Sequence, residues 1–446
     1  MKVVIVGAGE VGSYLAARLT RENHHVVVVE QDAERALHVE QHIDAHVVTG
    51  SGSHPDVMAA AGIRAADLLV AVTTDDEANL VACMLARQAG VERRIARIEA
   101  AALRAPEAAD LLRAAGADEV IDPDAETAVE ILHLLDYPGA TEINMLADDR
   151  VAVVGTVLGP DSPLVGRPLS ESFAPYGPDW EFLIGAVSRG DRTVIPRRDM
   201  VLQSGDVVRI VDLGTSSNEL RHLLGLTHAR ANRVMLLGGG RTGEMVAERL
   251  VEMHAEVCLV ERDPERAREL AETLDDVLIL EGDITDAELL EEERVGDHDA
   301  VIAVTGNDED NILACLYAKS MGVPETIALL HRLEFLPLLR TLGIDGALSP
   351  RTACANGVMR IIRGGVQVAT YLDMDVEVLE MTVADGSGVH GQRICDLHLP
   401  KEVLIAAVVR DGTSMIGRGH TVLQEQDHLV VFARPKAVAA ARKRFE

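Results

Sequence analysis

The stretch VVIVGAGEVG, residues Val3–Gly12, decides the fold of this chain, because an apolar run leads directly into a glycine-rich loop. In a Gly-x-Gly-x-x-Gly loop between a strand and a helix, the first glycine permits a tight turn and the second lets a phosphate approach the backbone. The third lets the helix pack closely on the strand. The N-terminus of that helix then offers free N–H groups to an anion. Gly7, Gly9 and Gly12 therefore predict a phosphate-binding loop.

An acidic residue follows at the distance that such a loop requires. Glu30 ends a strand-like run of four valines, Val26–Val29, and lies 18 positions beyond Gly12. A carboxylate at this place can accept hydrogen bonds from both ribose hydroxyls and would repel a 2′-phosphate. The spacing therefore predicts an adenine nucleotide such as NAD(H) and disfavours NADPH.

The whole pattern recurs in the second half of the chain. VMLLGGGRTG, residues Val234–Gly243, repeats the first stretch 231 positions later, and Glu261 repeats Glu30 at the same offset. Thr73 and Asn79 recur as Thr305 and Asn311 at an offset of 232, so the halves align with one inserted residue. The chain is therefore interpreted as a tandem duplication.

Each half is predicted to contain two lobes. The first alternates short apolar strands with helices, which is typical of a parallel, doubly wound, Rossmann-like sheet. It ends in a further helix, Ala125–Leu135 in the first half, that leaves the sheet. The second lobe is small and rich in strands. We expect an α/β protein with N-lobes at residues 1–138 and 232–365 and β-rich α+β C-lobes at residues 139–225 and 366–446. Residues 216–224 are predicted to be a closing helix, and residues 226–232 a linker.

Composition excludes several classes of partner. The chain has 446 residues with 42 Lys and Arg against 72 Asp and Glu, a formal net charge of −30, and only 2% aromatic residues. This charge disfavours nucleic acid and anionic membrane surfaces as partners. The predominance of arginine over lysine is compatible with a codon bias, and the acidity with a saline cytoplasm. No long apolar run predicts a transmembrane helix or a signal peptide. Five scattered cysteines fit a reducing cytosol and predict neither disulfides nor a metal site.

The two glycine loops differ in charge. The first contains Glu10, whereas the second contains Arg241. Arg241 can reach the outer phosphates of a nucleotide, whereas Glu10 would repel them. One hypothesis is that the first half prefers NAD(H) and the second accepts ATP or ADP. The alternative is that both side chains point to solvent.

An oxidoreductase is the rival interpretation from a different functional class. Hydride transfer needs a proton donor or acceptor beside the cofactor. The 16 histidines do not form a recognisable acid–base or metal-binding constellation. Two nucleotide lobes in one chain also suit a sensor better than an enzyme with one cofactor. We therefore expect no catalytic residues.

The motifs together resemble a known family. They are GAGEVG (7–12), GSGSHP (50–55), VAVTTDDEANLVACMLA (70–86), IARI (95–98), YPGA (137–140), GGGRTG (238–243), GDITD (282–286), AVTGNDEDN (303–311) and LPKEVLIAAVVRDG (399–412). On these residues the chain resembles the TrkA family of tandem RCK (regulator of potassium conductance) proteins. These are cytosolic nucleotide-binding subunits of bacterial Trk potassium uptake systems.

The resemblance implies the residues of two nucleotide sites. The first would comprise Gly7, Ala8, Gly9, Glu10, Val11, Gly12, Glu30, Thr73, Thr74 and Arg97. The second would comprise Gly238, Gly239, Gly240, Arg241, Thr242, Gly243, Glu261, Asp283 and Thr305. Arg97 aligns with Leu329, so the second site lacks that cation. The resemblance therefore leaves the choice between NAD(H) and ATP or ADP open for each half.

The resemblance also implies partners and a location. Family members form a ring of eight RCK units, here a homotetramer, on the cytosolic face of the inner membrane. The ring docks on a TrkH-like potassium-translocating subunit without inserting into the membrane, and nucleotide binding gates ion flow. The alternative within the same class is a regulatory subunit of a potassium/proton antiporter.

Overall fold

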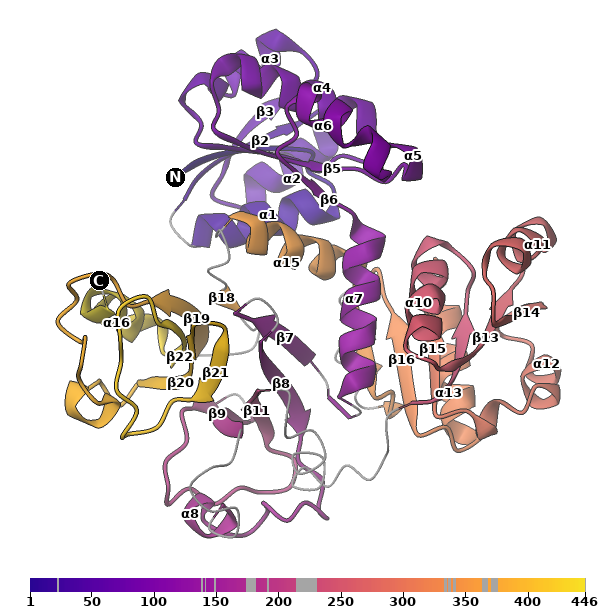
Figure 1. The fold of residues 1–446 in the computed structure, drawn as a ribbon. Helices are drawn as coiled ribbons and strands as arrows, with labels where there is room; N and C mark the ends of the chain where they lie inside the picture. Colours follow the sequence, from indigo (N-terminus) through magenta and orange to yellow (C-terminus); the bar gives the residue numbers. More distant parts are fainter. Residues whose placement is uncertain are drawn as a thin grey trace.

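The computed structural model describes residues 1–21, 24–137, 139–140, 142–147, 150–173, 182–190, 192–213, 231–332, 335, 338–339, 342–362, 368–369 and 376–445. Within these ranges the chain forms two six-stranded and two five-stranded sheets. The predicted α/β fold with two tandem units is confirmed. Figure 1 shows the first N-lobe at the top and the second at the right, with the first C-lobe at the bottom and the second C-lobe beside it at the left.

The first N-lobe is a parallel sheet with the strand order β3-β2-β1-β4-β5-β6. The order reverses between β1 and β4, and ligands bind at such a switch point, beyond the carboxyl ends of the strands. Helices cover both faces, so β4 is buried at every position. The strands are β1 (Lys2–Val6), β2 (His25–Glu30), β3 (His46–Thr49), β4 (Leu68–Ala71), β5 (Arg93–Arg97) and β6 (Glu119–Ile121). The helices are α1 (Glu10–Arg21), α2 (Ala33–His42), α3 (Pro55–Ala60), α4 (Asp76–Ala89), α5 (Ala101–Arg104) and α6 (Ala109–Ala115), with 3₁₀ turns η1 (Ile63–Ala65) and η2 (Pro106–Ala108).

The second N-lobe repeats this topology in the order β14-β13-β12-β15-β16-β17. Its strands are β12 (Arg233–Leu237), β13 (Glu256–Glu261), β14 (Val277–Glu281), β15 (Ala300–Ala303), β16 (Glu325–Leu329) and β17 (Gly346–Leu348). Its helices are α10 (Arg241–Glu252), α11 (Pro264–Thr273), α12 (Ala287–Glu292) and α13 (Asp308–Ser320), with the 3₁₀ turn η4 (Val295–Asp297). The sequence repeat is therefore also a structural repeat.

The C-lobes are antiparallel sheets that share one core. The first has the order β10-β9-β11-β8-β7 and the second β18-β19-β22-β20-β21. Apolar residues of both sheets, including Val153 and Phe432, form a single buried cluster. Gly185 makes this packing possible, because a Cβ atom there would lie 2.3 Å from the Phe432 ring. The elements of the first C-lobe are β7 (Glu142–Leu146), β8 (Val151–Val157), α8 (Leu169–Ser172), β9 (Phe182–Arg189), β10 (Arg192–Val194) and β11 (Val207–Asp212). Those of the second are β18 (Val368–Ala369), β19 (Glu377–Thr382), η6 (Ile394–Leu397), β20 (Val403–Arg410), β21 (Thr413–Ile416), β22 (His428–Ala433) and α16 (Pro435–Phe445).

Two helices are exchanged between the N-lobes. Helix α7 (Pro123–Asp136) follows the first sheet, as predicted, but buries Ile131 and Leu134 in the core of the second N-lobe. Helix α15 (Pro350–Ile362) follows the second sheet and buries Val358 and Ile362 in the core of the first. The two helices cross each other between the lobes (Figure 1). The N-lobes are therefore joined by reciprocal core packing.

Several sequence predictions concern residues that the structure does not describe. The proposed lobe boundaries lie at residue 138, within 214–230 and within 363–367, all outside the described residues, so the division into four ranges stays a prediction. The same holds for the closing helix at 216–224 and for most of the linker at 226–232. Within the described part of the chain, no helix is both long and apolar enough to cross a membrane.

Candidate functional site

The first glycine loop has the geometry that its sequence predicts. Gly7 has a φ of +102°, a conformation that side-chain-bearing residues rarely adopt. A Cβ atom on Gly12 would lie 1.9 Å from the Gly7 carbonyl oxygen, so only glycine lets α1 approach β1 this closely. A Cβ atom on Gly9 would meet nothing within 4 Å, because Gly9 lines a cavity. The loop thus leaves its middle glycine open to a ligand.

Glu30 lies buried beneath this loop, at the end of β2. Its Oε2 accepts a hydrogen bond from the Ala8 N–H at 2.5 Å, and its Oε1 accepts one from the Asp32 N–H at 2.9 Å. Asp32 in turn caps α2, because its side chain accepts from the Glu34 and Arg35 N–H groups. The carboxylate is therefore held at the edge of the loop, where it faces the cavity.

A buried asparagine joins the ends of β4 and β5. The Asn79 side chain is completely buried, and its amide donates to the carbonyl oxygens of Thr73 at 3.0 Å and Arg97 at 2.9 Å. Its Oδ1 accepts from the Thr73 N–H and, at 2.7 Å, from the Thr73 hydroxyl. This clamp places Thr73, Thr74 and Arg97 at the same edge of the sheet as the glycine loop. The repeat identified Asn79 only as a position that aligns the halves, and its positioning role was missed.

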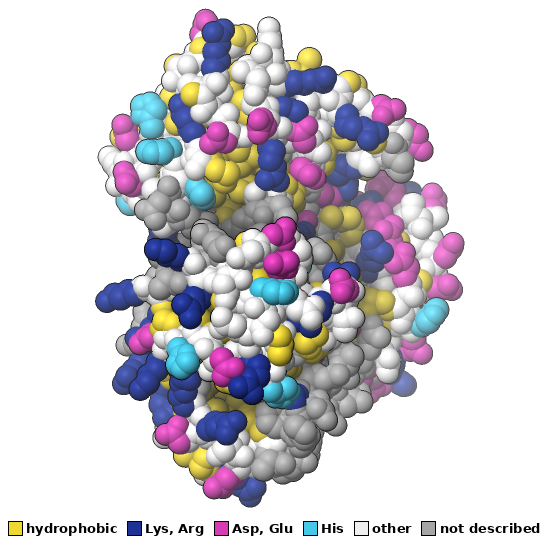
Figure 2. Space-filling model, turned by 60° about the vertical axis from the view of Figure 1, so that its left-hand side comes forward, with side chains coloured by type: hydrophobic (Ala, Val, Ile, Leu, Met, Phe, Trp, Pro, Cys, Tyr) yellow, Lys and Arg dark blue, Asp and Glu magenta, His cyan; other side chains and the backbone are white. Residues whose placement is uncertain are grey.

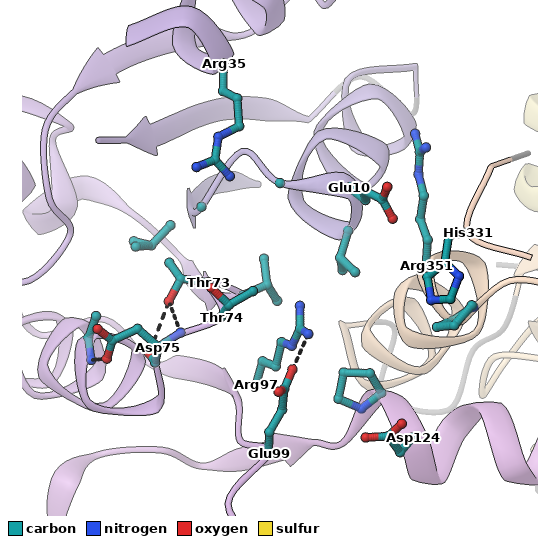
Figure 3. A pocket seen from close by; sticks show the side chains of 18 of the residues that line it. Glu10, Arg35, Thr73, Thr74, Asp75, Arg97, Glu99, Asp124, His331 and Arg351 are labelled. Carbon is teal, nitrogen blue, oxygen red and sulfur yellow. Dashed lines mark hydrogen bonds and ion pairs between the residues drawn. The ribbon is translucent and has the colours of Figure 1, made fainter. Parts of the chain in front are cut away.

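These residues surround a cavity of about 690 Å³, which is within the range of small-molecule sites. Figure 3 shows Arg97 and Glu99, joined by an ion pair, pointing into it below the glycine loop, with Arg35 across from them. Glu10 lies at the start of α1, and Arg351 lies to the right of it in the same view. The Nε atom of Arg97 is buried without a hydrogen-bond partner. The cavity therefore offers guanidinium groups to an anionic ligand.

The second glycine loop has the same backbone. Gly238 has a φ of +116°, and a Cβ atom on Gly243 would lie 2.0 Å from the Gly238 carbonyl oxygen. Glu261 accepts from the Gly239 N–H at 2.7 Å, as Glu30 does from Ala8. Asn311 repeats the clamp of Asn79, since it accepts from the hydroxyl of Thr305 at 2.6 Å. Duplication has therefore preserved the scaffold of both loops.

The side chains around the second loop differ from those around the first. Arg266, the counterpart of Arg35, donates to the Gly239 carbonyl oxygen at 2.9 Å and to Glu244 at 2.7 Å. Arg241 forms ion pairs with Asp122 at 3.0 Å and with Asp124 at 3.2 Å, both at the start of α7. In the first half, Arg35 pairs with Asp32 at 3.9 Å. Protein side chains therefore occupy the rim of the second loop.

The predicted site residues divide into three groups. Most line the cavity: Gly7, Gly9, Glu10, Val11, Glu30, Thr73, Thr74, Arg97, Gly240, Arg241, Thr242 and Thr305. A second group belongs to the two loops and their strands without lining it: Ala8, Gly12, Gly238, Gly239, Gly243 and Glu261. Asp283 stands apart, because hydrogen bonds from the N–H and hydroxyl of Thr285 hold its carboxylate and lower its pKa. Arg241 points at Asp122 and Asp124, so the idea that both loop side chains face solvent is wrong for the second loop.

Some cavity residues were not predicted from the sequence. Asp124, at the start of α7, and Arg351, at the start of α15, line the cavity because the two helices are exchanged between the lobes. His331 lines it at the position that corresponds to Glu99. Arg35 also lines the cavity, and the 231-residue offset that pairs it with Arg266 was a usable signal for this position. No sequence signal reveals the exchange.

The described residues show little that suits covalent or metal chemistry. Burial raises the pKa of the Cys83, Cys315 and Cys354 thiols to about 12, so they are protonated at neutral pH and are poor nucleophiles. Within the described ranges, no group of three His, Cys, Asp or Glu residues is placed to hold a metal ion. What the arrangement can do is bind an anionic ligand between two glycine loops.

Comparisons with known proteins match the whole chain. The TrkA-N domain family matches residues 3–123 and 234–350, and the TrkA-C domain family matches residues 153–225 and 378–446. The Trk system potassium uptake protein TrkA of Azorhizobium caulinodans is 35% identical over 440 residues, covering 97% of this chain and 96% of that protein. The TrkA homolog 1 of Methanosarcina mazei is 34% identical over 461 residues and covers both chains completely.

A solved structure shares the fold. The GsuK channel bound to NAD superposes with a TM-score of 0.60 at 20% identity, covering 100% of this chain and 78% of the channel chain. At this identity the likeness concerns the fold of the tandem units. The relatives matched by sequence are potassium uptake proteins by name, which favours a transport role over an oxidoreductase.

Proposed function

Because the chain belongs to the TrkA family, as its four domain matches and its full-length relatives show, we propose that it is the nucleotide-sensing subunit of a potassium uptake system. In this role it is not an enzyme. Nucleotides bind to its N-lobes and bias the shape of an assembly that controls a potassium-translocating membrane protein. The energy available for such gating is the difference in nucleotide affinity between the two shapes.

The cavity between the two glycine loops is the observation that carries this proposal, and its wall in the first N-lobe matters most. It combines an open Gly9, a buried carboxylate at Glu30 and the cation of Arg97 within one space of about 690 Å³. Phosphates suit the loop and the arginines, whereas ribose hydroxyls suit Glu30. A 2′-phosphate would meet the Glu30 carboxylate, so NAD(H) fits better than NADPH. The GsuK channel, which has this fold, binds NAD, and that property of the channel agrees with this choice of ligand.

The second N-lobe is proposed as a weaker nucleotide site with a different preference. Its glycine loop has the same backbone, and Arg241 supplies a cation that the first loop lacks. A ligand rich in phosphate charge, such as ADP or ATP, is the best candidate to draw Arg241 away from its carboxylate partners. Leu329 stands where the first site has Arg97, so the two sites should rank nucleotides differently.

The proposed partner is a TrkH-like subunit on the cytosolic face of the inner membrane. The chain would assemble there as a homotetrameric ring of eight RCK units. Because the chain has a net charge of −30, we expect it to dock on basic loops of that partner rather than on lipid headgroups. Figure 2 shows acidic side chains gathered at the right of that view and basic side chains gathered at its lower left. Docking should therefore weaken as salt rises.

Two measurements test the proposal. Calorimetric titration of the full chain with NADH, NADPH, ADP and ATP should give binding of NADH and much weaker binding of NADPH. Potassium flux through vesicles that contain a TrkH-like subunit and this chain should then change when NADH, ATP or ADP is added. If the chain controls flux only through a potassium/proton antiporter, then that antiporter is its partner in place of the TrkH-like subunit. Reduction of NAD⁺ to NADH with simple alcohols or hydroxy acids as hydride donors would overturn the proposed class.

A further inference from the structure

We propose that the start of helix α7 is a carboxylate latch on the second glycine loop, and that an ADP phosphate enters this loop only by displacing Asp124. The latch consists of Asp122 and Asp124 on α7 with Arg241 and Thr242 on the loop. The inference rests on the proposed nucleotide binding and adds a regulatory link between the second site and the first C-lobe.

The contacts of the latch are close and specific. Asp124 Oδ1 accepts a hydrogen bond from the Thr242 hydroxyl at 2.6 Å, and Asp124 Oδ2 lies 3.2 Å from Arg241. Both oxygens of Asp122 accept from Arg241 Nη2, at 3.1 and 3.0 Å. Asp122 is buried and also pairs with Arg104, so its charge is shared by two guanidinium groups. Two carboxylates of the first half thus hold the loop of the second half.

The location of Asp124 explains why it would compete with a phosphate. Arg241 and Thr242 are the first residues of α10, a helix of 12 residues whose N-cap, Gly240, provides no side-chain hydrogen bond. The start of such a helix attracts an anion through its free N–H groups and its dipole. The Asp124 carboxylate already supplies negative charge there. An incoming phosphate would meet both that charge and an Arg241 already engaged.

The first half shows the opposite arrangement. At the positions that correspond to Arg241 and Asp124, it has Glu10 on the loop and Arg351 at the start of α15. Arg351 lies over the ring of Tyr14, with 5.8 Å between its Cζ and the ring centroid, and its Nε is buried without a hydrogen-bond partner. The exchanged helix therefore brings a cation to the first loop and carboxylates to the second. The latch is a property of the second site.

The far end of α7 gives the latch a mechanical consequence. The hydroxyl of Tyr137, directly after α7, donates to Asp212 of β11 at 3.0 Å. The carbonyl oxygen of Gly139 accepts from Thr156 of β8 at 2.8 Å. Helix α7 therefore runs from the second glycine loop to the first C-lobe. Release of its first turn by a nucleotide would change how these two parts are held together.

The experiment isolates the second site in the full chain. Gly9→Asp places a carboxylate into the first loop, where its Cβ atom would meet no protein atom within 4 Å, and should silence the first site by charge repulsion. Asp124→Asn in this background keeps an oxygen for the Thr242 hydroxyl and removes the charge. We expect ADP to bind roughly tenfold more tightly, the effect of one charge at a partly buried helix end. Asp110→Asn, whose side chain is 93% exposed on α6, is the matched control and should leave the affinity unchanged.

Hydrogen exchange supplies a second readout. In the Gly9→Asp protein, ADP should increase exchange in residues 123–127 if it displaces the latch. Unchanged or weaker ADP binding after Asp124→Asn, or bound ADP without faster exchange, overturns the latch. A different result tests the proposed function independently of the latch. If the Gly240→Asp protein, whose first loop is intact, binds no NADH, the proposed function is wrong. ADP binding that emerges only with Asp124→Asn supports the latch in either case.

Discussion

The two N-lobes have the same backbone at their glycine loops and different side chains around them. Gly7 and Gly238 share a positive φ, and Glu30 and Glu261 hold the loop N–H groups in the same way. Both loops line one cavity, but Arg266 and the Asp124 carboxylate contact the second loop, and the described residues make no equivalent contacts with the first. Steric constraints therefore preserve the backbone of the two duplicated loops, whereas the charged side chains around the loops have diverged. Four predictions test how far the two sites differ.

The middle glycines provide the sharpest test. Gly9→Asp should weaken NADH binding by about a hundredfold or more, because a carboxylate would lie where phosphates must come. Gly240→Asp, at the equivalent open position, should leave the tighter NADH site intact. Calorimetry on both full-length variants makes the comparison, and thermal melts should show that both still fold. The comparison breaks if Gly240→Asp costs more NADH affinity than Gly9→Asp.

The first residues of β5 and β16 are equivalent in the repeat but differ in charge. This difference predicts that the free energy of unfolding depends on pH through the second half only. Arg93 donates to the carbonyl oxygens of Ile361 and Ile362, at the end of α15. Its counterpart Glu325 accepts from the Gly139 N–H at 3.1 Å, just after α7. Burial raises the pKa of Glu325 from 4.5 to about 8, with the Asp345 charge adding to the shift. The second sheet therefore contacts the segment after α7 through the Glu325 carboxyl group, whose pKa lies near neutral pH.

The sign follows from the raised pKa. In the unfolded chain Glu325 ionises first, so its contribution to stability is full below about pH 4.5 and is lost as pH rises towards about 8. Glu325→Gln should remove a pH dependence of the free energy of unfolding on the order of 4 kcal/mol between pH 5 and pH 8.5. Denaturant titrations at pH 5, 7 and 8.5 measure it. Glu256→Gln, 80% exposed in the same lobe, is the control, and an equal change there would refute the prediction.

The two buried asparagines should be alike in stability and unlike in binding. Asn79→Ala and Asn311→Ala each remove a clamp of four hydrogen bonds and should lower the free energy of unfolding by about 2 kcal/mol. Only Asn79→Ala should also weaken NADH, because it releases Thr73 and Arg97 at the open cavity. Urea denaturation and NADH titration separate the two effects. An equal loss of NADH affinity in both variants would remove the distinction between the sites.

Replacing the cation of the first site makes it more like the second. Arg97→Leu copies Leu329 and should weaken NADH or ADP binding at the first site by about tenfold, close to 1.4 kcal/mol. Titration of the Gly240→Asp protein with and without this change isolates the first site. Arg113→Leu, with a side chain 70% exposed on α6, should have no effect. A first site indifferent to Arg97→Leu would mean that the guanidinium does not touch the ligand.

Much of each N-lobe could be predicted from local sequence. The valine run before Glu30 predicts β2, and the structure places β2 at His25–Glu30. The single inserted residue between the repeats preserves both asparagine clamps. The sequence pattern of residues 106–115 predicts one helix, whereas the structure has a 3₁₀ turn at 106–108 before α6. Strand and loop residues respond to their immediate neighbours, so short patterns suffice for them.

The rim of each site could not be predicted in this way. Asp124 is separated from Arg241 by more than one hundred positions, and Arg351 from Tyr14 by more than three hundred. Their contacts exist because α7 and α15 are exchanged between the lobes. An amphipathic helix pattern shows that one face will be buried, but not against which lobe. For this reason the ion pair between Arg241 and Asp122 could not be predicted from the sequence.

The sequence by itself determined the duplicated α/β scaffold, the two glycine loops and the acidic residue behind each. Turn conformation, strand burial and close helix packing depend on residues near one another in the chain. The tertiary structure alone decided that the loops face a common cavity, that one rim is open, and that carboxylates of the first half close the other. These features arise from packing between distant segments, and the energy that selects one packing is spread over many small apolar contacts.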